Sequence, residues 1–317
     1  MKERQQASRV FMVEPTHFGY NSQTAHSNAF QKSTPLAPEQ IQKQALAEFR
    51  NFVAQLKEVG IEVYALKSSA KTPLPDAVFP NNWISLHANG TLVLYPMLTE
   101  NRRAERDPEI IAYLESKLAI QQIKDFTAAE DENAIVEGTG SIVFDHIHKI
   151  AYACLSERTN QALFEEICRF LNYRAVAFTA LDAAGKAIYH TNVMMSVAED
   201  YALVCLESIP SQKERDLLKQ TLTATKKEVV SISLEQLNAF AGNALELRNL
   251  EGKRYLVVSR TAFNALTTHQ KKIIERSAQL LPIDISTIET IGGGSVRCML
   301  AEIFCPIKNE KITLELL

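Results

Sequence analysis

Three residues suited to nucleophilic catalysis stand at distinctive places in this chain of 317 residues. Cys298 ends the segment Gly292-Gly-Gly-Ser-Val-Arg-Cys and precedes an apolar run. Because a glycine-rich backbone turns sharply and approaches a ligand closely, this pattern suits a thiol nucleophile at the mouth of a pocket. Glu137, in Glu-Gly-Thr-Gly-Ser, and His190, in Tyr-His-Thr-Asn, are its candidate partners. The case for Cys298 as a nucleophile rests on these two upstream partners as well as on its own surroundings.

The chain repeats one pattern of elements, and this repeat could bring the distant residues together. A short strand-like run recurs at intervals close to fifty-five residues, at 61–66, 123–127, 175–179, 229–233 and 282–286. After each of the first four runs come a loop and two β-rich segments joined by a turn, which predicts a hairpin. The fifth hairpin is predicted to begin within 296–304 and to be completed by 311–316 or by the N-terminal 10–13.

Amphipathic stretches separate each hairpin from the next strand and predict helices at 38–58, 102–117, 157–172, 211–224 and 262–280. A closed ring of five such modules would let each module bury the apolar face that its neighbour leaves open. The sequence therefore predicts an α/β fold with pseudo-fivefold symmetry, a single domain over residues 10–317 and a loose tail over residues 1–9.

The residues with chemical potential occupy matching places in the five modules. Each lies roughly fourteen to twenty residues after the start of its module's strand; they are Asn82, Glu137, His190, Asn243 and Cys298. Equivalent points of a closed ring converge on its axis. We therefore expect these side chains to share one pocket.

Composition excludes several classes of protein. A net charge of −3 and a pI near 6.2 argue against a nucleic-acid partner. No apolar run is long enough to cross a bilayer, and the N-terminus lacks the apolar core of a secretion signal. Five cysteines without a Cys-x-x-Cys motif favour free thiols in the cytoplasm. No cluster has metal-ligand spacing, so neither a metal nor a cofactor is expected, and His146 and His148 are predicted to face solvent.

The ordered motifs carry a resemblance to a known superfamily. Glu-Gly-Thr-Gly, Ser-Glu-Arg-Thr-Asn, His-Thr-Asn and Gly-Gly-Gly-Ser-Val-Arg-Cys are similar to motifs of the guanidino-group-modifying penteins, over nearly the whole chain. The resemblance implies a five-bladed propeller of ββαβ modules. It also implies that Cys298 is the nucleophile, His190 the general acid–base and Glu137 the positioning carboxylate. Phe79-Pro-Asn-Asn-Trp resembles the branch of citrulline utilization hydrolases most closely.

Two positions depart from the pattern of members with cationic substrates. Where those members carry aspartates that grip a guanidinium, this chain has Asn82 and Asn192. A guanidinium only donates hydrogen bonds, whereas a neutral ureido group both donates and accepts, which suits carboxamides. The expected reaction is therefore hydrolysis of citrulline to ornithine, carbon dioxide and ammonia through a carbamoyl thioester on Cys298.

Further site residues follow from the resemblance and from position. Arg158, in a stretch similar to the dimethylarginine hydrolases, is expected to hold the substrate's α-carboxylate bidentately. Arg297 is a second candidate for that role, or for activating the thiol. Asn243 is a possible pocket contact, although a turn residue is the plainer interpretation.

Other functions stay open at this point. The same triad serves arginine deiminases, dimethylarginine hydrolases and amidinotransferases, and the same propeller serves a non-catalytic ribosome anti-association factor. The residues at the ring axis argue against a pure binding protein. The partner expected from the sequence is a small amino-acid substrate, with a homodimer as a possible assembly.

Overall fold

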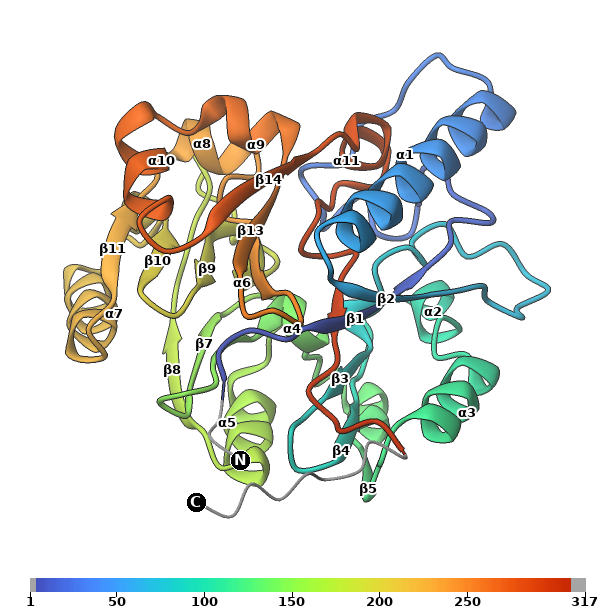
Figure 1. The fold of residues 1–317 in the computed structure, drawn as a ribbon, viewed down its shortest axis with the longest axis horizontal. Helices are drawn as coiled ribbons and strands as arrows, with labels where there is room; N and C mark the ends of the chain where they lie inside the picture. The colour runs from blue at the N-terminus through green and yellow to red at the C-terminus, as the bar shows by residue number, and fades with distance from the viewer. Residues whose placement is uncertain (1–3, 309–317) are drawn as a thin grey trace.

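The computed structural model describes residues 4–308, which form five three-stranded sheets with helices outside them (Figure 1). Every sheet has the same topology, in which a middle strand pairs with one neighbour antiparallel and with the other parallel. The α/β fold and its fivefold repetition of one unit are thus confirmed at the level of sheet topology.

The strands follow the predicted runs closely. In chain order the sheets are β3 (Ile84–Leu86), β4 (Thr91–Leu94) and β5 (Gln122–Asp125); β6 (Val143–Asp145), β7 (Ile150–Cys154) and β8 (Arg174–Phe178); β9 (Met195–Val197), β10 (Tyr201–Val204) and β11 (Glu228–Ser231); β12 (Leu245–Arg248), β13 (Arg254–Ser259) and β14 (Gln279–Ile283); and β15 (Ala301–Glu302), β1 (Arg9–Val13) and β2 (Glu62–Leu66). Middle strands such as β7 are buried along their whole length, because neighbouring strands and packed helices cover them.

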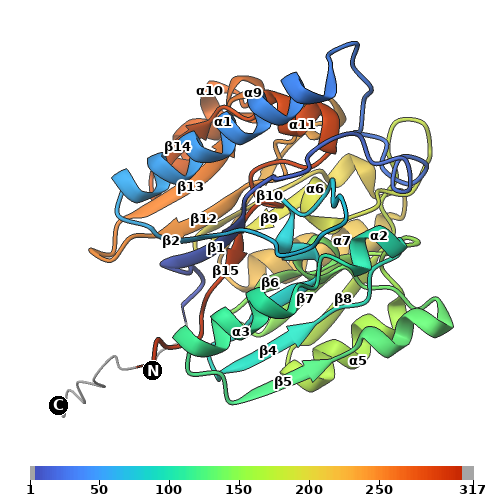
Figure 2. The same cartoon turned by 90° about the vertical axis from the view of Figure 1, so that its right-hand side faces the viewer.

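The helices lie mostly on the outside of the sheets. They are α1 (Pro38–Glu58), α2 (Glu100–Arg103), α3 (Pro108–Lys117), α4 (Gly138–Ser141), α5 (Gln161–Leu171), α6 (Thr191–Met194), α7 (Gln212–Ala224), α8 (Leu234–Asn238), α9 (Arg260–Ala265), α10 (Thr268–Ile274) and α11 (Ser286–Gly292), with 3₁₀ turns at Pro80–Asn82, Thr127–Glu132 and Leu206–Ser208. In Figure 2, α1, α10 and α11 lie at the top of the molecule, and α3 and α5 lie in its lower half, beside β4 and β5.

Two predicted helices are interrupted, for reasons of local chemistry. The stretch 102–117 divides into α2 and α3, because Pro108 opens a new helix and the Asp107 side chain caps it by accepting from the Glu109 N–H at 2.9 Å. The stretch 262–280 divides into α9 and α10, with Thr267 as the cap of the second helix. Its last two residues belong to β14, whose pairing with β13 overrides the helical pattern.

The fifth sheet joins the two ends of the described chain. Strand β1 pairs antiparallel with β15 and parallel with β2, so the N-terminal alternative for completing the fifth hairpin is the one observed. The other alternative, 311–316, lies outside the described residues. In Figure 1, β1 crosses the centre of the molecule beside the last strand.

The predicted loose tail is wrong for the residues that immediately precede β1. Gln5, Gln6 and Ala7 are all buried. The Gln5 amide donates to the carbonyls of Phe144 (2.9 Å) and Val197 (3.0 Å), which belong to two different sheets. These polar side chains are buried because strand carbonyls from distant modules satisfy them.

Candidate active site

Cys298 lies in the turn between α11 and β15. Gly293, in the left-handed region with φ of 64°, ends α11, and Gly294 packs against the ring of Phe79. A Cβ at Gly294 would lie 2.9 Å from that ring, so the close approach requires glycine. The glycine run thus lets the chain leave the helix and turn, and it places Cys298 at the start of the fifth hairpin with only 3% of its surface exposed.

Two asparagine amides surround the sulfur of Cys298. The Nδ2 atoms of Asn243 and Asn192 lie 3.2 and 3.5 Å from Sγ. The Asn243 oxygen accepts from the main-chain N–H of Arg297 at 3.1 Å, which fixes the amide with its nitrogen toward the sulfur. Asn243 is therefore a direct neighbour of the candidate nucleophile and more than a turn residue. Donors at these distances stabilise negative charge on sulfur.

His190 and Glu137 form a buried pair. Each stands immediately before a short helix, His190 before α6 and Glu137 before α4. Their Nε2 and Oε2 atoms are 2.8 Å apart, and both side chains are buried. Burial lowers the pKa of His190 to about 4, although Glu137 opposes this shift. The imidazole is therefore neutral at pH 7 and donates its Nε2 proton to the carboxylate.

Glu137 is kept ionised by a group of neighbours. Its Oε2 lies 3.3 Å from Arg158 Nη1 and 3.8 Å from Arg102 Nη1, and its Oε1 accepts from the Leu98 N–H at 3.0 Å. Burial by itself raises the pKa of Glu137, but Arg158, the hydrogen bond from His190 and Arg102 outweigh it and hold that pKa well below its usual range. A carboxylate held in this way stabilises positive charge on the adjacent imidazole.

Arg158 is buried in the loop before α5. Besides Glu137, it contacts the Thr24 carbonyl and the Ser27 hydroxyl, and its guanidinium carbon lies 5.0 Å from the centre of the Tyr189 ring. Its Nε is buried without a hydrogen-bond partner among the described residues. Arg158 therefore combines a fixed position with a free donor.

A second buried arginine, Arg102, was not predicted from the sequence. Its Nε and Nη2 donate to both oxygens of Glu105 at 2.9 Å, and its Nη1 donates to Asn82 Oδ1 at 2.9 Å. Asp76 lies 3.8 Å from Nε and keeps one oxygen, Oδ1, without a partner. Burial raises the pKa of Asp76. In sequence, Arg102 follows Glu100-Asn and resembles an ordinary solvent-facing helix residue, so only its location reveals it.

Gly140 marks the place where Asn82 and His190 come together. A Cβ there would lie 2.4 Å from Asn82 Nδ2 and 2.8 Å from both Nδ1 and Cε1 of His190. The second glycine of Glu-Gly-Thr-Gly is thus required by the close approach of two side chains. Asn82, Glu137, Arg158 and His190 thus form one buried group, and Asn192 and Asn243 contact Cys298. The chain from His190 to Asn192 and the hydrogen bond from Tyr189 to the Gly293 carbonyl connect the two groups.

Comparison with known proteins now bears on this geometry. The model of the family described as eukaryotic N,N-dimethylarginine dimethylhydrolase matches residues 14–305. The chain belongs to this family. Together with the similar structures below, the match confirms the resemblance to the pentein superfamily that the motifs indicated. No curated protein matches the sequence.

Several solved structures share the fold. ArgZ, an arginine dihydrolase from the ornithine–ammonia cycle in cyanobacteria, is 17% identical in its apo form, with a TM-score of 0.71 over 95% of this chain and 41% of that one. The ArgZ N-terminal domain bound to substrate is 18% identical, with a TM-score of 0.71 over 95% and 99%. A dimethylarginine dimethylaminohydrolase adduct with 4-chloro-2-hydroxymethylpyridine is 15% identical, with a TM-score of 0.62 over 94% and 100%. The chain thus spans about two fifths of full-length ArgZ and nearly all of its N-terminal domain.

The segment between β1 and α1 covers the site. Asn21 donates to Asp76 at 2.7 Å, Thr24 and Ser27 contact Arg158, and Asn28 donates to the Gly293 carbonyl at 3.3 Å. These contacts connect the cover to both the arginine side and the cysteine side of the site. In this closed arrangement Glu137 and His190 are at most 2% exposed.

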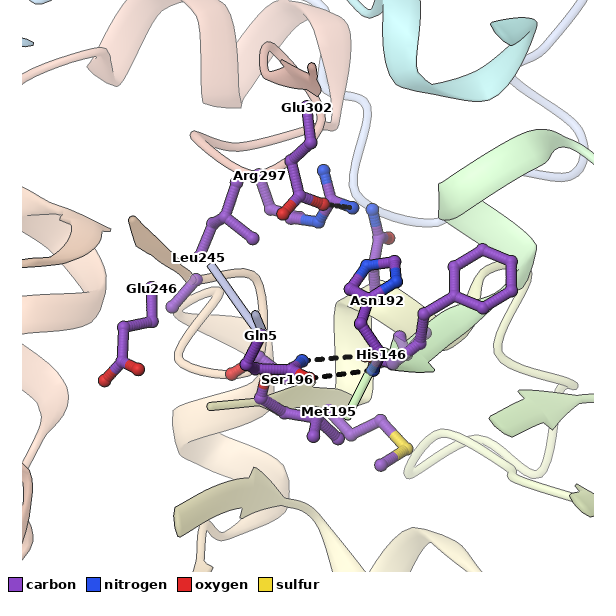
Figure 3. A pocket seen from close by; sticks show the side chains of 13 residues that line it. Gln5, His146, Asn192, Met195, Ser196, Leu245, Glu246, Arg297 and Glu302 are labelled. Atoms are coloured by element: carbon purple, nitrogen blue, oxygen red, sulfur yellow. Dashed lines mark hydrogen bonds and ion pairs between the residues drawn. The ribbon is translucent and has the colours of Figure 1, made fainter. Parts of the chain in front are cut away.

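Arg297 reaches the site through its main chain and not through its guanidinium. Its side chain pairs with Glu302 at 3.0 Å and donates to the Leu300 carbonyl at 2.8 Å. Figure 3 shows Arg297, Glu302, Asn192 and His146 around a small pocket. The structure therefore does not place the Arg297 guanidinium among the contacts of the candidate substrate groups.

The predicted solvent-facing histidines behave differently from each other. His148 is exposed and contacts Asp145. His146 is half-buried, packs on Phe304 with ring centres 4.3 Å apart and contacts the Tyr173 hydroxyl at 2.8 Å, so its prediction is wrong.

Three other cysteines illustrate the ordinary environment of a thiol in this fold. Burial raises the pKa of Cys154, Cys168 and Cys305 to about 12, as expected for cysteines that fill a core. Within residues 4–308, no three His, Cys, Asp or Glu side chains are arranged to hold a metal ion. The described helices also include none that combines the length and the apolar character needed to span a bilayer.

Proposed function

We propose that the protein is a cysteine-dependent hydrolase of a ureido carbon–nitrogen bond, with citrulline as its substrate and ornithine, carbon dioxide and ammonia as its products. Cys298 is the nucleophile, His190 the general acid–base and Glu137 the carboxylate that supports His190. Membership in a family of hydrolases that act on dimethylarginine supports this class of reaction.

The observation that carries the substrate assignment is the orientation of two amides. Arginine only donates, so Arg102 fixes Asn82 with Oδ1 toward itself, and Asn82 Nδ2 is left buried without a partner. Asn192 directs its Nδ2 toward Cys298, and its Oδ1 is left buried without a partner. The site thus offers one unpaired donor and one unpaired acceptor. A ureido group, with one carbonyl and N–H groups, satisfies both, whereas a guanidinium would leave the donor unpaired.

The first half of the proposed reaction forms the covalent intermediate. The Cys298 thiol passes its proton to the neutral His190, and Glu137 stabilises the imidazolium that results. The sulfur attacks the ureido carbon, and the carbon–nitrogen bond to ornithine breaks. The proton on His190 goes to the departing nitrogen, which leaves a carbamoyl thioester on Cys298.

The second half removes the carbamoyl group. A water molecule gives its proton to His190, which is neutral again, and its oxygen bonds to the carbamoyl carbon. The thiolate leaves, stabilised by the amides of Asn192 and Asn243 at 3.5 and 3.2 Å, and then takes the proton back from His190. The released carbamic acid decomposes to carbon dioxide and ammonia, so the atoms of citrulline and one water are accounted for.

Two further unpaired groups suit the amino-acid end of the substrate. Arg158 Nε is a buried donor for an α-carboxylate, and Asp76 Oδ1 is a buried acceptor for an α-ammonium group. Both are side chains that the cover segment also contacts. The proposal therefore assigns the two ends of the substrate to different sets of residues.

The closure of the five sheets into a propeller is also part of the proposal. The five sheets are the blades of one ring, and the candidate residues meet on its axis. Support comes from the identical topology of the sheets and from the pairing of β1 with β15, which joins the first and last strands of the described chain. A homodimer stays a prediction.

A second candidate is a dihydrolase that begins with arginine and reaches ornithine through citrulline. The observation that favours it is Glu137, a buried carboxylate held ionised, which is also an acceptor suited to a guanidinium. ArgZ, whose N-terminal domain this chain matches in fold, is described as an arginine dihydrolase.

Product analysis separates these functions. The purified protein is incubated separately with citrulline, arginine and dimethylarginine, with Cys298→Ala as the matched control. Ornithine and ammonia from citrulline but not from arginine, absent with the variant, is the expected result. Ornithine from arginine with transient citrulline would establish the dihydrolase instead. Citrulline that accumulates from arginine or dimethylarginine would overturn the ureido assignment.

The amide argument has its own test in Asn82→Asp and Asn192→Asp. Each change replaces an amide that matches the mixed ureido pattern with an acceptor-only carboxylate. We expect kcat/KM for citrulline to fall on the order of tenfold to a hundredfold, with the ratio of arginine to citrulline turnover rising. Citrulline turnover that survived both changes intact would contradict the specificity argument.

A further inference from the structure

The glycine run before Cys298 creates a problem of positioning. Three consecutive glycines have more backbone freedom than any other tripeptide, and a displacement of about 1 Å at a reacting atom can cost on the order of a hundredfold in rate. The run must therefore be held from outside. Two side chains donate to the same carbonyl in it, that of Gly293, namely the Tyr189 hydroxyl at 2.7 Å and the Asn28 amide at 3.3 Å.

Tyr189 also contacts His190, Arg158 and the cover segment. It precedes His190 in the chain, and the two rings lie 4.7 Å apart between centres. Its ring centre lies 5.0 Å from the Arg158 guanidinium carbon, and its ring packs edge-to-face with Phe30 of the cover segment, with ring centres 6.1 Å apart. Its own carbonyl accepts from the Ser156 hydroxyl at 2.8 Å, which fixes the main chain.

The two ends of Tyr189 make different contacts. The hydroxyl is buried, and burial raises its pKa, so it stays protonated and donates to Gly293. The ring supports Arg158 by a cation–π contact. We propose that Tyr189 is a positioning residue that connects the cysteine side and the arginine side of the site. Its hydroxyl holds the Cys298 turn, and its ring holds Arg158 for the substrate's carboxylate.

Two variants separate the role of the Tyr189 hydroxyl from the role of its ring. Tyr189→Phe keeps the ring and loses only the hydroxyl, so we expect kcat to fall about tenfold with KM within about twofold of wild type. Tyr189→Leu loses the ring as well, so KM should rise in addition, by about tenfold. Tyr152→Phe is the matched control, because the Tyr152 hydroxyl is buried in the core without a hydrogen-bond partner among the described residues. This control should leave kcat, KM and the rate of hydrogen–deuterium exchange unchanged.

A substrate-independent measurement accompanies the kinetics, because the roles of kcat and KM rest on the proposed function. Hydrogen–deuterium exchange of peptides covering 286–300 should be several-fold faster in Tyr189→Phe and unchanged in Tyr152→Phe. Faster exchange in Tyr189→Phe, from a wild-type protein that turns over none of the substrates, would support the positioning role of Tyr189 and would refute the proposed function. Normal exchange and normal kcat in Tyr189→Phe would overturn the inference, and so would a Tyr189→Leu variant whose KM equals that of Tyr189→Phe.

Discussion

The two sides of the candidate active site are built from different kinds of polar group. Residues 76–158 supply a charged side, in which two buried arginines face three carboxylates; these are Arg102, Arg158, Asp76, Glu105 and Glu137. Residues 192–298 supply a neutral side, in which two amides surround the sulfur of Cys298. His190 bonds to the charged side through Glu137.

This difference matches the demands that a covalent hydrolysis makes on its site. The charged side must keep a carboxylate ionised in a buried place, which requires cations within a few ångströms. The neutral side must stabilise sulfur only while it carries negative charge, and amide N–H groups do so without attracting a permanent counter-ion. A neutral ureido group can enter between the two sides without adding a charge that either would have to balance.

The largest expected effect comes from neutralising the centre of the charged side with Glu137→Gln. The change removes the carboxylate that supports His190 and leaves two buried arginines with less compensation. We expect turnover to fall about a thousandfold to ten-thousandfold, by analogy with the loss of a triad carboxylate, and the free energy of unfolding to fall by about 3–5 kcal/mol.

Kinetics with saturating substrate and urea unfolding measure these two quantities. Glu228→Gln is the matched control, since Glu228 pairs with Arg276 at 2.9 Å on the surface and should matter to neither measurement. If Glu137→Gln kept more than a tenth of the wild-type rate, the charged side would have no role in supporting His190.

The next largest effect is expected at Gly140, where the charged side meets His190. In Gly140→Ala the added Cβ would lie 2.4 Å from Asn82 Nδ2 and 2.8 Å from the His190 ring, so both side chains must shift. We expect kcat to fall about a hundredfold, with the fold retained. Gly19→Ala is the control, because its Cβ would meet nothing within 4 Å. Equal rates for the two variants would show that the separation of Asn82 and His190 is not critical.

The same comparison shows what can be predicted from a sequence. The neutral side and the three candidate catalytic residues could be picked out, because glycine runs and repeated spacing are local signals, and the strands that position them start close to the predicted residues. The charged side was only partly visible. Arg102 and Asp76 stand on irregular segments or short helices, where a buried ion pair and an exposed one have the same sequence pattern.

The N-terminal residues were missed for a related reason. Gln5 carries no apolar pattern, yet it is buried by hydrogen bonds to strands 139 and 192 residues away. Arg297 shows the opposite error, since its closeness to Cys298 in sequence suggested a role for a guanidinium that instead pairs with Glu302. Contacts of such long range, and the direction of a side chain beside a turn, are set by packing that no local motif records.

A smaller effect should separate the two amides of the neutral side. Asn243 lies closer to the sulfur and is fixed by the Arg297 N–H, so Asn243→Ala should lower kcat about tenfold with little change in KM. Asn192→Ala removes a longer contact to sulfur together with the unpaired oxygen assigned to the substrate, so KM should rise as well. Steady-state kinetics of the two variants measure kcat and KM. Identical changes in both variants would contradict the assignment of separate roles.

The smallest expected effect concerns stability alone and lies outside both sides of the site. Burial, reinforced by Lys149, lowers the pKa of His87 to about 4, against an ordinary value of 6.5. Between these two pH values the unfolded chain binds a proton that the folded chain does not, so His87 costs stability as the pH falls from 6.5 toward 4. At pH 5 the cost is about 2 kcal/mol.

Urea unfolding at pH 7 and pH 5 tests this. Between these pH values His87→Gln should lose less of its free energy of unfolding than wild type loses, with kcat at pH 7 unchanged. An equal acid loss in both proteins would mean that His87 is not the group that titrates, and a changed kcat would extend the catalytic machinery beyond the two sides described.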